Sequence, residues 1–411
     1  MDTLKVRDAK DVEQAVRAAL EAEQPLEIIG HGTKRNIGLP MATNALLDLS
    51  ALNAVTLYEP NELVLTVQAG APMADVLSLI DSKNQQFAFD PIDTSMLLGT
   101  PSGAGTIGGM IASGLAGPRR IRAGGVRDHL LGAHAVSGFG DSFKTGGRVV
   151  KNVTGYDLCK LLAGSWGTLS VMTEVTLKVM PKAETERTII LRGLDDLSAN
   201  RAMTSAMGSP YDVSGAAHVP ASTFSIAGDT LSALGIQGRS ATLIRLEGIG
   251  ASVPHRAGSV CDALKAYGSA DIIADDVSAS VWAALRDVAP FAASGQVGAW
   301  PVWRIVCPPA SGAAFGQALV KSSGAHVFYD WSGGLILAAI PPSVADAHAE
   351  QLRAGLKDIG GHATLLRVSD QVRQRVDAFH PQEAGVAALG RRVKASFDPK
   401  NILNRGRMVR A

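Results

Sequence analysis

The sequence predicts an α+β fold in which two larger domains are followed by a closing segment. Three observations lead to this prediction. Helix and strand patterns alternate over the first 90 residues, glycine is concentrated between Gly99 and Gly167, and the order strand-helix-strand-strand-helix-strand follows from Val302. With 411 residues, 46% of them hydrophobic, the chain has enough apolar material for more than one large core.

The first domain opens with an alternating α/β unit. Apolar positions at helical spacing predict a helix over residues 8–22. Short apolar runs predict strands at residues 25–29, 44–49 and 63–69. Pro72 opens a second helix, because proline is well tolerated in a first helical turn. The Gly-rich stretch G-H-G-T-K-R-N-I-G, at 30–38, directly follows the first of these strands.

A glycine-rich segment completes the first domain. Seventeen of the 44 glycines lie between Gly99 and Gly167, where they indicate backbone close to a bulky group or turns with positive φ. Within this segment, G-F-G-D-S-F-K-T-G-G predicts a hairpin turn between strands at A-H-A-V and R-V-V-K. After Gly167, alternation with period two predicts a strand that ends at Pro181.

The second domain is predicted to begin after the polar joint at residues 181–186. The clearest pattern predicts strands at 302–306, 326–330, 335–340 and 363–368, with helices at 310–321 and 343–356. This is the ferredoxin-like order. A looser copy is predicted between residues 188 and 276, with strands near 188–192, 213–218 and 241–247 and helices near 195–206 and 252–267. Two such units could share one antiparallel sheet, and a helical stretch follows from Ser369.

Charge and composition argue against several classes of partner. The 39 basic and 38 acidic residues give a net charge of +1, which provides no attraction for nucleic acid or an anionic membrane. An aromatic content of 5% also argues against base stacking. No nucleic-acid partner is therefore expected.

The three cysteines predict neither a disulfide framework nor a metal centre. Cys159, Cys261 and Cys307 are far apart and form no C-x-x-C motif, so we expect small buried side chains and no metal site. The N-terminus has no signal-peptide pattern, and no window of 18 apolar residues predicts a membrane span. A cytoplasmic protein is expected, with peripheral attachment to the inner membrane through partners left open.

The loop at 30–38 suits an anion, because bare backbone N–H groups lie beside Lys34 and Arg35. The alternative is a tight turn that carries surface charges. The loop is not a dinucleotide fingerprint, since Pro40 follows where a helix is needed, and no Walker A loop occurs in the chain. A second Gly-rich segment at 99–114 would complete a two-sided site for a diphosphate.

Several segments, in this order, resemble one family. They are P-S-G-A-G-T-I-G-G-M-I-A-S-G from Pro101, V-R-D-H-L-L-G from Val126, and G-R-V-V-K-N-V-T-G-Y-D-L-C-K-L-L-A-G-S-W-G-T-L-S-V-M-T-E-V-T-L-K-V from Gly147. Together they resemble the FAD-binding domain of the vanillyl-alcohol oxidase / p-cresol methylhydroxylase (PCMH) superfamily. The K-N-V-T-G-Y-D-L run is most similar to the FAD-binding E subunits of bacterial glycolate oxidases. The closing F-D-P-K-N-I-L-N-R-G-R is similar to the family's D-P-x-x-x-x-N-P-G-[KR], with Arg405 in place of proline.

The resemblance implies three parts of the chain. They are a PCMH-type FAD-binding domain of two α/β subdomains at 1–182, a ferredoxin-like antiparallel cap domain at 183–368 with duplication left open, and a C-terminal helical segment at 369–411 that returns to the FAD domain. It also implies non-covalent FAD, because His31 lacks the R-S-G-G-H context of covalent members.

The resemblance implies roles for three groups of residues. The first pyrophosphate loop is matched by Gly30, His31, Gly32, Thr33, Lys34 and Arg35. The second flavin segment is matched by Pro101, Ser102, Gly103, Gly105, Thr106, Gly108 and Gly109. The segment near the adenosine half is matched by Gly164, Ser165, Gly167, Thr168, Leu169 and Val171.

The catalytic residues are less well defined. A 2-hydroxy acid would lose its α-hydrogen as a hydride while a base takes the hydroxyl proton. Arg245 and Arg304, mid-strand in the cap, are candidates for binding the carboxylate; the alternative for each is a solvated sheet face. The His-rich metal-binding segment and the E-H-G motif of catalytic 2-hydroxy-acid members are missing from the sequence.

The resemblance therefore implies an FAD-binding subunit of a glycolate oxidase or dehydrogenase complex. Its implied partners are a second FAD subunit and an iron–sulfur subunit, and its implied substrate is a small 2-hydroxy acid. Two alternatives remain open. One is a stand-alone flavoenzyme for another 2-hydroxy acid or alcohol, and the other is a non-catalytic structural subunit.

Overall fold

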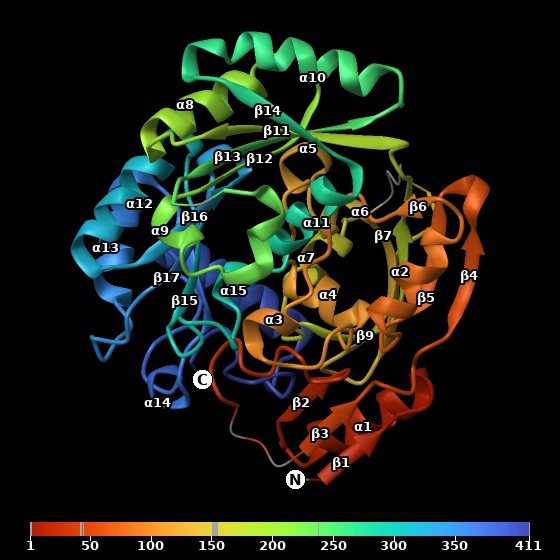
Figure 1. Cartoon of the computed structure of the whole chain (residues 1–411). Coiled ribbons are helices and arrows are strands. Elements are labelled where there is room, and N and C mark those ends of the chain that lie inside the picture. Colours follow the sequence, from red (N-terminus) through yellow and green to blue (C-terminus); the bar gives the residue numbers. More distant parts are fainter. Residues whose placement is uncertain (1, 42, 44, 150–154, 237, 411) are drawn as a thin grey trace.

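The computed structural model describes residues 2–41, 43, 45–149, 155–236 and 238–410 (Figure 1). A small parallel sheet stands at the N-terminus, in the order β1 (Asp2–Lys5), β3 (Ala45–Asp48) and β2 (Leu26–Ile29). Helix α1 (Ala9–Glu21) covers it and buries Val12 and Val16, as the helical spacing predicts. Asp8 caps this helix by accepting a hydrogen bond from the Asp11 amide.

A five-stranded antiparallel sheet forms the second half of the first domain. Its order is β4 (Val55–Glu59), β5 (Val64–Gln68), β9 (Ser170–Lys178), β7 (Leu130–Ser137) and β8 (Ser142–Gly146). The helices of this half are α2 (Met73–Asp81), α3 (Ser95–Leu98), α4 (Ile107–Ser113), α5 (Arg120–Ala123), α6 (Val126–His129) and α7 (Cys159–Leu162). Two short strands, β6 (Gln85–Gln86) and β10 (Met180–Pro181), pair beside the sheet.

The prediction that the second strand of the hairpin lies at R-V-V-K is wrong in register. The second strand is Ser142–Gly146, so the turn is shorter than predicted. Gly146 has φ of +67°, and a Cβ there would lie 2.0 Å from the Leu131 carbonyl, so the extended pairing stops at this residue. Arg148 and Val149 follow outside a strand, and Val150 and Lys151 lie outside the described residues.

The cap domain is one eight-stranded sheet, in the order β14-β11-β13-β12-β16-β17-β15-β18. Its first unit consists of β11 (Thr185–Arg192), α8 (Asp196–Met207), β12 (Val213–Val219), β13 (Ala241–Gly248), α10 (Ser252–Ala263) and β14 (Ala270–Ala274). Its second unit consists of β15 (Val302–Val306), α12 (Pro309–Ser323), β16 (His326–Asp330), β17 (Leu335–Ala339), α13 (Ala349–Ile359) and β18 (His362–Arg367). Both units have the ferredoxin-like order, and they join where His218 of β12 pairs with Tyr329 of β16.

Two predicted helices of the cap differ from the structure in length. Helix α13 begins at Ala349 rather than at residue 343, because Ala347 and His348 have φ of +52° and +61° and break the helical run. Helix α10 ends at Ala263, and a short 3-10 turn over Lys265–Tyr267 follows. Strand β14 was not predicted, since its half-exposed edge position gives a weak alternation.

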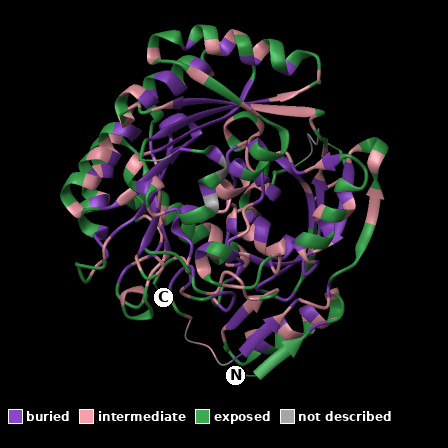
Figure 2. Cartoon of the chain, in the orientation of Figure 1, coloured by how far each residue is buried: buried purple, intermediate pink, exposed green. Residues whose placement is uncertain are grey.

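The cap sheet has one face toward its own helices and one toward the first domain. Helices α8, α10, α12 and α13 lie on the outer face (Figure 1). The inner face packs with α11 (Asp275–Arg286) and with Leu97 and Leu115 of the first domain in one apolar cluster. The strands of the sheet are accordingly buried along most of their length (Figure 2).

The C-terminal segment returns to the first domain, as the resemblance implied. After α14 (Asp370–Arg373) and α15 (Ala384–Phe397), the Asp398 carboxylate accepts hydrogen bonds from the Ile402 and Leu403 amides. Leu403 then bridges to Leu26 of β2 in parallel fashion. The domain boundaries at residues 182 and 368 stay predictions. The remaining short helical turns are Pro60–Glu62, Ala221–Phe224, Gly228–Leu234, Ala289–Phe291 and Trp331–Gly333.

Candidate functional site

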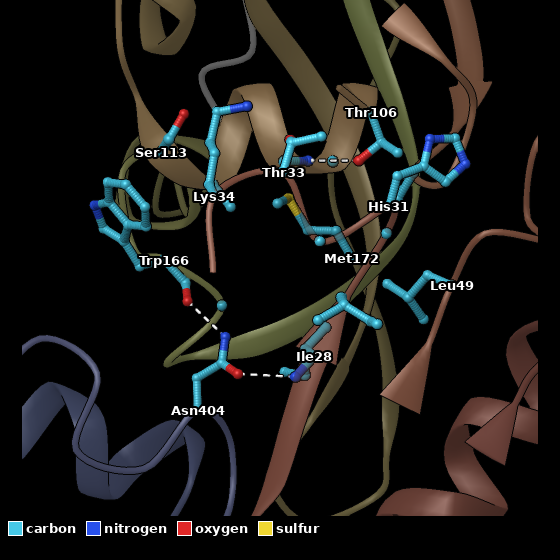
Figure 3. A pocket seen from close by; sticks show the side chains of 18 of the residues that line it. Ile28, His31, Thr33, Lys34, Leu49, Thr106, Ser113, Trp166, Met172 and Asn404 are labelled. Carbon is cyan, nitrogen blue, oxygen red and sulfur yellow. Dashed lines mark hydrogen bonds between the residues drawn. The ribbon is translucent and has the colours of Figure 1, made fainter. Parts of the chain in front are cut away.

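A pocket lies where the small sheet, helix α4 and the C-terminal segment meet (Figure 3). It holds about 740 Å³ of space, counting the part that opens to solvent. It is lined by Ile28, Ile29, Gly30, His31, Gly32, Thr33, Lys34, Arg35, Leu49, Ala69, Thr106, Gly108, Gly109, Ala112, Ser113, Trp166, Gly167, Ser170, Met172, Asn404 and Arg407.

The two Gly-rich loops meet at the mouth of this pocket. A Cβ on Gly30 would lie 2.6 Å from the Thr106 hydroxyl, so the close approach requires glycine. His31 reaches across, and its Nδ1 donates to the Ala104 carbonyl at 2.8 Å. Thr106 caps α4 by accepting from the Gly109 amide at 3.2 Å. The glycine at position 30 thus serves the packing of the two loops against each other.

The two cations of the first loop have different surroundings. Arg35 forms a two-pronged ion pair with the buried Glu27, at 2.8 Å and 2.5 Å. Lys34 lines the pocket, and no carboxylate within the described part of the chain lies within 4.0 Å of its Nζ. Burial lowers the pKa of Lys34 to about 8, and Asp93 opposes this shift. Lys34 is therefore the cation available to an anion in the pocket.

The C-terminal segment closes one side of the pocket. The Asn404 side chain donates to the Trp166 carbonyl at 2.7 Å and accepts from the Ile28 amide at 2.8 Å (Figure 3). Arg407 lies over the Trp166 ring at 5.5 Å and donates to the Lys34 carbonyl at 2.5 Å. These contacts tie both ends of the chain to one site.

The structure brings ten of the cofactor residues predicted from the resemblance to this wall: Gly30, His31, Gly32, Thr33, Lys34, Arg35, Thr106, Gly108, Gly109 and Gly167. The other nine do not line it: Pro101, Ser102, Gly103, Gly105, Gly164, Ser165, Thr168, Leu169 and Val171. Val171 lies in the core beneath α1, and the Gly103 amide is held by Asp93 at 3.0 Å. Their roles at the cofactor stay predictions.

Sequence reasoning assigned no role to Trp166, Ser113, Asn404 or Arg407, although each stands inside a quoted motif. Their positions within those motifs were the sequence signal from which a role in the pocket could have been predicted. The apolar wall residues Ile28, Leu49 and Ala69 stand at or just beyond the ends of strands, where ligand sites form in such sheets.

Arg245 is part of a buried charge cluster between the domains. Arg119 of the first domain donates to Asp90 and to Glu247, each at 2.5 Å, and Arg245 lies 3.3 Å from both carboxylates. Burial opposes ionisation of Glu247, but Arg245 and Arg119 outweigh it and lower its pKa to about 2. Arg245 also stacks on Trp282 at 4.5 Å. Its guanidinium is already paired, so the sheet face here is not solvated.

Arg304 lies on β15 and faces a different cavity between the two domains. Its Nε has no hydrogen-bond partner among the described residues, and its guanidinium stacks on Trp331 at 4.9 Å. Of the two arginine candidates, Arg304 is therefore the one without a carboxylate partner among the residues that the structure describes.

Comparison with known proteins agrees with this architecture. Residues 3–146 match the family model of the FAD binding domain, and residues 379–408 match that of the C-terminal domain of FAD linked oxidases. Glycolate oxidase subunit GlcE of Escherichia coli (strain K12) is 29% identical over 400 residues, which cover 96% of this chain and 95% of that protein. Glycolate oxidase subunit GlcD of Bacillus subtilis (strain 168) is 32% identical over 185 residues, 45% of this chain and 38% of that one.

Solved structures agree on the fold. p-Cresol methylhydroxylase with substrate bound superposes with a TM-score of 0.70 at 14% identity, covering 99% of this chain and 88% of that chain. 4-Ethylphenol oxidase from Gulosibacter chungangensis gives 0.71 at 13% identity, covering 99% and 89%. The chain has the PCMH-type fold. The predicted PCMH-type fold with its antiparallel α+β cap, the FAD cofactor and the class of FAD-dependent oxidoreductase are confirmed.

Two observations show that the pocket fits FAD. Glycines of two loops bring backbone without side chains to the pocket wall, and Lys34 supplies a positive charge with no carboxylate within 4.0 Å among the described residues. That FAD is held without a covalent bond stays a prediction.

The described residues contain no group of three His, Cys, Asp or Glu side chains arranged to hold a metal ion. In the same part of the chain, no helix has the length and apolarity needed to cross a bilayer.

Proposed function

We propose that this chain is the FAD-binding subunit of a glycolate oxidase or dehydrogenase complex, in which glycolate is oxidised to glyoxylate. The observation that carries the proposal is the match to a glycolate oxidase subunit across 96% of this chain, cap domain included. The inner face of the cap sheet lies over the first domain. Sequence similarity in the cap therefore bears on the substrate as well as on the cofactor. When bound, FAD accepts a hydride from the carbon that bears the substrate hydroxyl.

The chain's own residues would bind and orient the cofactor. Lys34 would neutralise charge on the diphosphate, while the glycines of the two loops would let the cofactor approach the backbone closely. The hydrogen bond between Asn404 and Trp166 would hold the C-terminal segment in place as one wall of the pocket. The cation inside the pocket has no carboxylate within 4.0 Å in the described part of the chain, which supports a cofactor-binding subunit over a structural subunit that has lost its flavin.

The proposed partners are a second FAD subunit and an iron–sulfur subunit, which would receive the electrons. Support comes from relatives that are themselves named as subunits of glycolate oxidase. Cys159, Cys261 and Cys307 are free and distant in sequence, so an iron–sulfur cluster would belong to a partner. Cytoplasmic location, with attachment to the inner membrane through those partners, is part of the same proposal.

The test is anaerobic reduction of the purified protein, alone and with its co-purified partners. We expect a flavin spectrum from the chain alone and bleaching by glycolate when the partners are present. Bleaching of the isolated chain would favour the stand-alone enzyme, for which D-lactate and 2-hydroxyglutarate are the comparison substrates. A colourless chain that cannot be reconstituted with FAD would refute the proposal.

A further inference from the structure

Lys34 and Asp93 contact the same short turn, at residues 102–105 of the second Gly-rich segment. The Asp93 carboxylate accepts a hydrogen bond from the Gly103 amide at 3.0 Å. A Cβ added to Gly105 would lie 3.8 Å from the Lys34 Nζ, so the ammonium group lies against the other end of this turn. A negative charge and a positive charge that are far apart in the sequence are thus neighbours through the 102–105 turn.

The two charges are close without forming a contact ion pair. Among the residues that the structure describes, no nitrogen of Lys, Arg or His lies within 4.0 Å of the Asp93 carboxylate, and no carboxylate lies within 4.0 Å of the Lys34 Nζ. Arg35, the next residue, differs because Glu27 pairs with it directly at 2.5 Å. A direct pair occupies the cation, whereas an offset charge acts through space and leaves the ammonium group open to another acceptor.

Asp93 is the carboxylate that opposes the effect of burial on Lys34. Burial lowers the pKa of Lys34 to about 8, and the charge of Asp93 raises it. The other charged or titratable groups of the pocket wall are His31 and Arg35 from the same loop and Arg407 from the C-terminal segment. None of these three carries a negative charge that could keep the ammonium group protonated.

The cap domain fixes the position of Asp93. The carboxylate of Asp287, the residue after α11, accepts a hydrogen bond from the Asp93 amide at 2.9 Å. Arg286 holds that carboxylate with two nitrogens, at 2.8 Å and 2.6 Å. The second oxygen of Asp93 accepts from the Ser95 amide at 3.0 Å. Both carboxylate oxygens and the amide of Asp93 are therefore engaged, which keeps its charge at a fixed place relative to Lys34.

We propose that Asp93 is a positioning residue of the cofactor site, whose carboxylate acts across the 102–105 turn to keep Lys34 protonated and open to the diphosphate of FAD. The inference rests on the proposed function, in which Lys34 neutralises the diphosphate, and it involves no substrate. A contact ion pair would compete with the diphosphate for Lys34. An uncharged neighbour would let burial remove the proton of Lys34 at a lower pH. The offset carboxylate avoids both outcomes.

The pH dependence of FAD binding tests this role. Equilibrium dialysis of the apoprotein with FAD is carried out between about pH 6 and pH 10 for wild type, Asp93→Asn and Asp93→Glu. In wild type, FAD affinity is expected to begin falling near pH 8, where Lys34 of the free protein loses its proton. In Asp93→Asn the fall is expected to begin about one pH unit lower, because the amide lacks the charge that favours the ammonium form. Asp93→Glu keeps that charge and should restore the onset of wild type.

Asp75→Asn is the matched control, because Asp75 is exposed on α2, the helix whose Ala74 lies beside Gly103. The same substitution is expected to leave the onset unchanged there, since solvent and salt screen an exposed charge. A role confined to holding the turn would lower FAD affinity equally at every pH. An unchanged onset in Asp93→Asn, or an equal displacement in Asp75→Asn, would overturn the proposal.

A second measurement applies if Asp93→Asn binds too little FAD for dialysis. Lys34 in the apoproteins is labelled with a small amine-reactive reagent across the same pH range, and the labelled peptide is quantified by mass spectrometry. Half-maximal labelling at a lower pH in Asp93→Asn supports the proposal, and equal values contradict it. If FAD affinity of wild type does not change with pH, the roles of Lys34 and Asp93 both fail. Reduction of the assembled complex by glycolate decides separately on the oxidation reaction.

Discussion

At the scale of single residues, the cofactor pocket distinguishes two adjacent cations. Arg35 is paired with Glu27, whereas Lys34 faces the pocket. Lys34→Met is therefore expected to weaken FAD binding about 10- to 100-fold, in line with the loss of one charge-assisted contact. Equilibrium dialysis of the apoprotein with FAD measures this. Arg35→Met is the comparison, and we expect it to lower thermal stability more than FAD affinity.

The pH dependence of FAD binding follows from the same residue. The pKa of Lys34 is about 8 in the empty pocket, and a bound diphosphate raises it because anions favour the charged form. The complex then holds more protons than the free protein above pH 8, so FAD affinity falls as pH rises from 8 to 10. Lys34→Met removes this slope. An identical slope in the variant would assign the effect to another group.

The sequence predicted the pocket loops well and its other walls poorly, for a physical reason. Gly30–Arg35 and Thr106–Gly109 were found because bare backbone leaves a local signature of glycine. Asn404 and Trp166 act through a hydrogen bond between residues 238 positions apart, which no local pattern records. Asp330 ended a predicted strand, and only the fold shows that it shares a cavity with Arg304.

At the scale of elements, the charge cluster of Asp90, Arg119, Arg245 and Glu247 joins the cap to the first domain. Arg119→Met leaves two buried carboxylates with one cation, which is expected to cost about 3–5 kcal/mol in free energy of unfolding. Chemical denaturation measures the loss. Arg122→Met is the control, since Arg122 pairs with Asp212 at the surface and should cost about 0–1 kcal/mol. Equal losses in the two variants would show that the cluster does not hold the interface.

The elements of the cap were largely predictable because each ferredoxin-like unit repeats short, strongly apolar strands between helices. Two signals failed. Edge strand β14 is half exposed, and α13 starts late because Ala347 and His348 adopt positive φ that composition does not reveal. The pairing of β12 with β16, which merges two units into one sheet, is a long-range contact that the sequence could only suggest.

At the scale of the whole molecule, Asn404 links the two ends of the chain. Asn404→Ala leaves the Ile28 amide and the Trp166 carbonyl without their partner, which is expected to cost about 1–3 kcal/mol for each buried group. The variant should melt at a lower temperature and lose FAD on gel filtration. Asn53→Ala, at an exposed position, should stay within about 0.5 kcal/mol of wild type. Unchanged flavin content in Asn404→Ala would show that this contact of the C-terminal segment does not contribute to cofactor binding.

The two hydrogen bonds of Asn404 have a consequence for the order of events during biosynthesis. Ribosomes release a chain from its N-terminus, so Gly30–Arg35 emerge long before Asn404 and Arg407. Until those last residues arrive, the Ile28 amide and the wall at Trp166 lack their partners. Cofactor loading is then a late, post-translational event, and a nascent chain stalled before residue 404 should be recovered without flavin.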